Sequence, residues 1–102
     1  MVVRKLVRDR IPELANGTAT FTQVVGVELV RALIEKLREE CEEVAQARNS
    51  RELTEEISDV VAVLRAIAAQ YHIDWEEVIA VEETKRRRRG GFVRGFYMNK
   101  EE

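Results

Sequence analysis

Acidic side chains recur three residues apart in two stretches of an otherwise apolar, helix-forming sequence. The first stretch reads E-E-x-x-E from Glu39 to Glu43, and after twelve intervening residues the second reads E-x-x-D from Glu56 to Asp59. Residues three or four apart lie on one side of a helix, so each stretch should present its carboxylates together. Converging carboxylates repel one another unless a cation lies among them. A divalent cation that prefers oxygen ligands, such as Mg²⁺, is the simplest such cation.

The helical positions of two of these acids are unusual. At about 100° per residue and with Leu33 at zero, Glu40 falls near 340°, inside the apolar stripe that also holds Val44. With Ile57 at zero, Glu56 falls near 260°, inside the apolar arc of its own helix. An unpaired buried carboxylate is costly or gives up its charge. These positions favour a metal site. The alternative, a solvated acidic face, is the usual interpretation of a Glu-rich helix and stays open.

The elements that must position these acids follow from the apolar spacing. It predicts a long helix over 27–47, a second helix that Ser50 caps and that runs to about Tyr71, and a third over 75–88 with Asp74 as its N-cap. Residues 12–15 can form at most about one helical turn, and residues 18–25 form a short strand or an extended link. Gly90 and Gly91 end the third helix, and we expect the apolar segment 92–98 to pack back on the bundle.

The predicted fold is all-α: an antiparallel helical hairpin plus a third helix. The apolar faces of the two long helices exceed what one thin third helix can cover. We therefore expect homodimerisation to complete a four-helix-bundle core. The whole chain, 1–102, forms one domain in this interpretation, with a basic N-terminal arm (1–25), a helical core (27–89) and a C-terminal tail (90–102).

Charge and composition limit the function. The net charge is −2, but its distribution is uneven: residues 35–59 contain nine acids and four bases, whereas both ends are basic. This distribution suits a site for a metal and a polyphosphate, and it disfavours nucleic acid, which needs one basic face. The single cysteine, Cys41, fits a reducing cytoplasm and is interpreted as a small core residue. No apolar run is long enough to span a membrane, so we expect a cytoplasmic protein.

The basic run from Lys85 to Arg89 has two readings. Cations at a helix C-terminus interact favourably with the helix dipole, so the run can be a solvated helix end. Five consecutive cations exceed what that role needs, and the glycines that follow let a ligand approach the backbone closely. Phosphate binding is the sharper interpretation, and the basic residues near the N-terminus have the same two readings. His72 has no partner for a carboxylate–histidine iron site and is interpreted as a helix-end residue.

Three sequence blocks occur in a fixed order: K-L-V-R-D-R-I-P-E from Lys5 to Glu13, the acidic motif, and K-x-x-x-R-G-G-F from Lys85 to Phe92. Together they resemble the all-α nucleoside triphosphate pyrophosphohydrolase superfamily. The likeness is greatest to its small MazG-like, phosphoribosyl-ATP-pyrophosphohydrolase-like branch of house-cleaning enzymes. It covers nearly the whole chain, from Lys5 to about Met98.

This resemblance implies roles for named residues. Glu40, Glu43, Glu56 and Asp59 would ligate Mg²⁺, with Mn²⁺ as a substitute. Glu39 would ligate a further ion or orient the attacking water, so Glu39 and Glu40 are the catalytic candidates. The phosphate-binding candidates, from the N-terminal block and the R-G-G-F block, are Lys5, Arg8, Arg10, Lys85, Arg88 and Arg89.

The expected reaction is Mg²⁺-dependent hydrolysis of a nucleoside triphosphate between its α and β phosphorus atoms. It gives a nucleoside monophosphate and pyrophosphate, and the expected substrates are damaged or surplus nucleotides. Two alternatives stay open at this point. One is hydrolysis of phosphoribosyl-ATP or another pyrophosphate-linked metabolite, and the other is a non-enzymatic helical dimer that binds nucleic acid or a protein partner.

Overall fold

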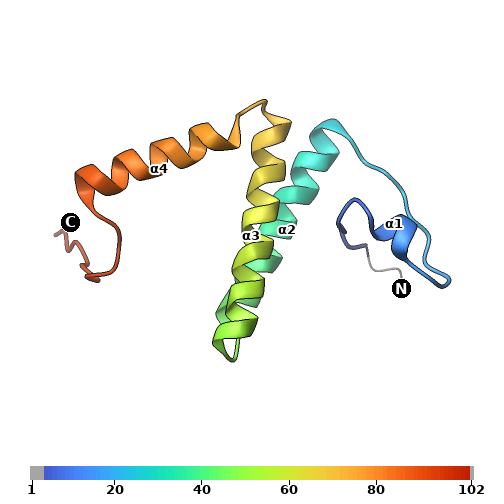
Figure 1. The fold of residues 1–102 in the computed structure, drawn as a ribbon, viewed down its shortest axis with the longest axis horizontal. Helices are drawn as coiled ribbons and strands as arrows, with labels where there is room; N and C mark the ends of the chain where they lie inside the picture. The colour runs from blue at the N-terminus through green and yellow to red at the C-terminus, as the bar shows by residue number, and fades with distance from the viewer. Residues whose placement is uncertain (1–3, 102) are drawn as a thin grey trace.

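A computed structural model describes residues 4–101, and this part of the chain is all-helical with no strand (Figure 1). The first three residues of the expected N-terminal arm and the last residue of the expected tail lie outside the described residues. The helices are α1 (Ile11–Leu14), α2 (Gly26–Gln46), α3 (Ser50–Gln70) and α4 (Trp75–Arg89). Residues 18–25 contain no strand; of the two expected forms, they adopt the extended link. Within the described range no helix is long and apolar enough to cross a membrane.

The two long helices, α2 and α3, lie side by side and make most of the contacts between elements (Figure 1). The link between them is short because Asn49 caps α3, its side chain accepting a hydrogen bond from the Glu52 backbone N–H at 2.9 Å. The Glu52 carboxylate also pairs with Arg48 at 3.1 Å. Hydrogen bonds from the Arg48 side chain and backbone lower the pKa of Glu52. The expected N-cap, Ser50, was wrong by one residue: Ser50 is the first helical residue of α3.

The buried apolar core is small and lies between α2 and α3. Only Leu33, Val63 and Ala68 are buried hydrophobic residues in the described chain. The radius of gyration is 17.4 Å, whereas a compact chain of this length has about 13 Å. The interpretation of Cys41 as a core residue was wrong, since its side chain is exposed. Its position near 80° on the helical wheel lies outside the stripe that α3 covers.

Helix α4 leaves the hairpin and extends away from it (Figure 1). Asp74 caps it as expected, accepting a hydrogen bond from the Glu76 N–H at 3.1 Å. The Arg65 guanidinium lies 5.1 Å from the centre of the Trp75 ring, so α3 holds the start of α4. Gly90 ends α4 with φ of +82°, a conformation that side-chain-bearing residues rarely adopt.

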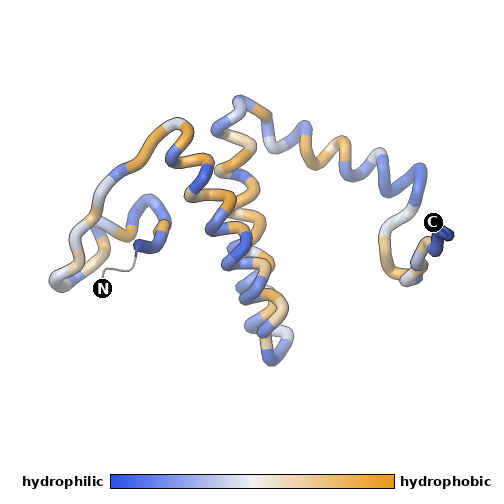
Figure 2. The backbone as a smooth tube through the Cα atoms, turned by 180° about the vertical axis from the view of Figure 1, so that it is seen from behind, coloured by the Kyte–Doolittle hydropathy of each residue, from blue (hydrophilic) through white to orange (hydrophobic). Residues whose placement is uncertain are grey.

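The C-terminal tail does not pack on the hairpin, so the expectation for residues 92–98 was wrong within this chain. Phe92, Val93 and Tyr97 are almost fully exposed. The reason is geometric, because α4 carries the tail away from the apolar faces of α2 and α3. Figure 2 shows the consequence: α4 becomes hydrophilic towards its end, and an apolar segment follows it with no neighbour.

Candidate metal centre

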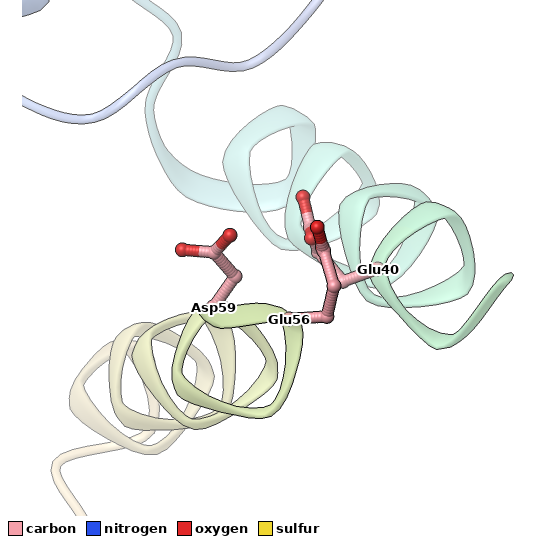
Figure 3. A group of neighbouring side chains, drawn as sticks. All are labelled: Glu40, Glu56 and Asp59. Atoms are coloured by element: carbon pink, nitrogen blue, oxygen red, sulfur yellow. The ribbon is translucent and has the colours of Figure 1, made fainter. Parts of the chain in front are cut away.

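Three carboxylates from the two long helices converge on one point. One oxygen each from Glu40 of α2 and from Glu56 and Asp59 of α3 lies within 4.8 Å of the others (Figure 3). Glu56 and Asp59 share one side of α3 because they are three residues apart. Glu40 faces them because it lies in the apolar stripe with which α2 packs on α3. These are three of the four predicted metal ligands.

Glu40 is the buried member of the group, with 8% of its surface exposed. Its charge is compensated by Lys36, one helical turn earlier, whose Nζ lies 3.3 Å from Oε1 of Glu40. The same ammonium lies 3.8 Å from Glu39. Sequence reasoning missed Lys36. The helical wheel could have found it, because Lys36 falls near 300°, between Glu43 and Glu40.

Glu56 is half-buried, and its carboxylate has no ion pair or hydrogen bond within residues 4–101. Partial burial and the negative charges of Glu43, Glu40 and Asp59 raise the pKa of its carboxyl. Both causes disfavour the charged form in the absence of a cation. Glu56 is therefore the carboxylate with the most to gain from a bound cation.

The N-terminal arm brings positively charged side chains to the three carboxylates. Nη2 of Arg8 lies 2.5 Å from Oδ1 of Asp59, and Lys5 lines the pocket that the acids form. This open pocket has a volume of about 270 Å³. Its walls are two lysines and five acids: Lys5, Lys36, Glu39, Glu40, Glu43, Glu56 and Asp59. All five acids singled out in the sequence thus line one pocket, although Glu43 is not part of the tight group of three.

The other predicted phosphate-binding residues lie elsewhere. Arg10 pairs with its neighbour Glu13 and is exposed. Lys85, Arg88 and Arg89 line a shallow depression of about 370 Å³ formed by one face of α4. Within one chain, α4 leads this basic block away from the acidic pocket (Figure 1).

The group of three carboxylates fits a hard divalent cation. All donors are oxygens, as Mg²⁺ and Mn²⁺ prefer, and the pocket contains no histidine or cysteine. An ion with bonds of about 2.1 Å can join oxygens up to about 4.2 Å apart. Small side-chain rotations bring oxygens separated by at most 4.8 Å within that reach.

Comparison with known proteins gives one match. The family model of the MazG nucleotide pyrophosphohydrolase domain matches residues 29–92, more than half of the chain. This segment runs from α2 to the end of α4 and contains all five acids of the pocket, whereas the N-terminal arm lies outside it. Neither the curated proteins nor the solved structures contain a match. The chain therefore belongs to the MazG nucleotide pyrophosphohydrolase family and is a hydrolase acting on nucleotide pyrophosphate bonds.

Proposed function

We propose that this protein is a Mg²⁺-dependent nucleoside triphosphate pyrophosphohydrolase that cleaves between the α and β phosphorus atoms. Its products are a nucleoside monophosphate and pyrophosphate, and its substrates are damaged or surplus nucleotides. The observation that carries the proposal is the meeting of Glu40, Glu56 and Asp59 within the segment that matches the family. The family match also disfavours the non-enzymatic binding module that the sequence left open.

The residues of the pocket divide the chemical work. Glu40, Glu56 and Asp59, with Glu43 beside them, hold the cation. When bound, a divalent cation neutralises charge on the phosphate oxygens and lowers the pKa of water. Glu39 lines the same pocket with its carboxylate half-exposed, and in this proposal it accepts the proton of the attacking water.

The basic residues of the pocket bind the polyphosphate. Lys5 lines the pocket and Arg8 contacts Asp59 from the arm, so both are near a phosphate that binds the cation in this proposal. Arg8 can bind phosphate with two parallel N–H bonds, which fixes orientation as well as charge. In this proposal the arm holds the pyrophosphate leaving group.

Screening a panel of nucleotides for pyrophosphate release tests the function. The panel contains ordinary and damaged nucleoside triphosphates together with phosphoribosyl-ATP, each with and without MgCl₂. We expect Mg²⁺-dependent release of pyrophosphate from at least one triphosphate. Turnover of phosphoribosyl-ATP alone would move the proposal to that alternative substrate, and release without any divalent cation would refute the metal role.

The site also depends on how the hairpin is covered, and we propose that a second copy of the chain covers it. Ile57 and Leu64 of α3 and its C-cap residue Tyr71 recur at seven-residue steps and remain 48%, 36% and 60% exposed. Apolar residues at this spacing form one seam that suits a partner helix. Sedimentation should show a dimer at micromolar concentration. A stable, folded monomer there would contradict the four-helix-bundle arrangement.

A further inference from the structure

The contact between Arg8 and Asp59 joins the N-terminal arm to the proposed metal ligands, 51 residues away in the chain. Most interactions of the other charged residues are local, between neighbours three or four positions apart on one helix. The arm lies outside the segment that matches the family, so the match assigns it no role. The long-range ion pair therefore needs an explanation of its own.

The charges around the pocket supply one. Five carboxylates line it, and the chain answers them with Lys36 from α2 and with Lys5 and Arg8 from the arm. The ion pairs Lys36–Glu40 and Arg8–Asp59 differ in solvent exposure. The Lys36 side chain is 16% exposed and fixed on its own helix, whereas those of Arg8 and Asp59 are 63% and 38% exposed. A pair exposed to this degree is weak, so Arg8 can leave Asp59 easily.

A divalent cation at Asp59 changes the balance at Arg8. The guanidinium is always charged and would stand within a few ångströms of the ion, which repels it. A polyphosphate on the same ion presents new oxygens close by. These oxygens match the two-pronged geometry of arginine at least as well as a carboxylate does.

We propose that Arg8 exchanges partners during binding. It neutralises Asp59 in the metal-free protein and passes to the substrate's phosphate once a divalent cation occupies the carboxylates, so the arm closes over the bound nucleotide. This inference rests on the proposed function. It adds an order of events and assigns Arg8 two opposing effects: it competes with the cation, and it assists the polyphosphate.

Calorimetric titration separates these two effects. MgCl₂ is titrated into the wild-type protein, into Arg8→Ala and into Arg38→Ala. Arg38 is the matched control, since it is an exposed arginine paired with Glu35 at 3.3 Å outside the pocket. We expect Arg8→Ala to bind Mg²⁺ about two- to fivefold more tightly, as removal of a weak surface competitor predicts. Arg38→Ala should bind Mg²⁺ like the wild type.

Inorganic pyrophosphate, titrated at saturating MgCl₂, measures the second effect. Arg8→Ala should bind it about tenfold more weakly, because a charge-assisted contact is lost. Opposite changes in the two affinities are specific to partner exchange. A merely structural arm would weaken both. A Mg²⁺ affinity that is unchanged or lower in Arg8→Ala, or an unchanged pyrophosphate affinity, overturns the proposal.

Trypsin cleavage after Arg10 of the wild-type protein, followed by mass spectrometry, reports the position of the arm directly. We expect faster cleavage in MgCl₂ alone, because Asp59 releases the arm, and slower cleavage when pyrophosphate is added. A cleavage rate insensitive to both ligands contradicts the exchange. If the wild-type protein binds no Mg²⁺ at all, the proposed function itself fails, and that result differs from a protein that binds Mg²⁺ without moving its arm.

Discussion

The acidic pocket and the basic end of α4 both carry many like charges, but only the acids lie next to a surface at which two helices pack. The acids lie at the border of the surfaces with which α2 and α3 pack, so burial of the apolar stripe also brings the carboxylates together. The basic run from Lys85 to Arg89 lies on a helix with few contacts to the rest of the chain. Charge pattern alone therefore does not place a functional group; its relation to a buried surface does.

The largest expected effect tests the pocket. Glu40→Gln and Asp59→Asn each remove the charge of a proposed cation ligand and should lower kcat at least about a hundredfold. Their helix content by circular dichroism should match that of the wild type, which shows that the loss is chemical. Full activity in both variants would return the acids to the status of a solvated face.

A smaller effect is expected at the basic end of α4. Replacement of Lys85, Arg88 and Arg89 together by alanine should leave kcat nearly unchanged, because these residues lie away from the acids of their own chain. If the second copy of the chain brings its α4 to the acidic pocket, phosphate contacts are lost and KM should rise about tenfold. Steady-state kinetics at saturating Mg²⁺ measures both constants. An unchanged KM would favour the other reading of the run, a solvated helix end.

The helix caps extend the comparison to stability. Asn49→Ala removes the cap of α3 and should cost about 1 kcal/mol, a fall of about 4–8 °C in Tm, because α3 is packed in the hairpin. Asp74→Ala removes the corresponding cap of α4, which has few contacts, and should shift Tm much less while lowering helix content. Equal shifts in Tm would mean that α4 belongs to the same cooperative unit as the hairpin.

The smallest effect concerns Glu56 and pH. Its pKa is raised above the usual 4.5, so the folded state binds its proton more tightly than the unfolded state does. Metal-free stability from this group is greatest below pH 4.5 and is lost as pH rises through the raised pKa. Glu56→Gln should therefore raise the metal-free Tm slightly at pH 7, and this gain should vanish near pH 4. Added Mg²⁺ should reverse the order at pH 7, since only the wild type keeps the ligand.

Much of the fold and of the candidate site could be predicted from the sequence where apolar residues recur with a regular helical period. The α2 and α3 stripes are regular, so both helix positions and the burial of Glu40 followed from the helical wheel. The position of α4 could not be predicted, because its apolar residues form no single face. The prediction for the tail was wrong for a similar reason: its apolar composition predicts burial but does not identify the surface against which it packs.

The residues missed or misplaced have local explanations. Lys36 was missed because the acids dominate the charge pattern of α2, although its wheel position resembles theirs. Ser50 and Asn49 are both good N-caps, and composition cannot choose between neighbours. The Arg8–Asp59 contact could not be predicted, since no periodicity relates an extended arm to a helix 51 residues later.

The pocket's three converging acids lie close in the chain, with 19 residues from Glu40 to Asp59 across one short link. Chains dominated by such nearby pairings fold within microseconds to milliseconds, because little loop-closure entropy opposes them. The acidic pocket should thus be among the earliest native features to form in a newly made chain. An ion captured at that stage would bias the nascent hairpin towards its final register before α4 has found any neighbour.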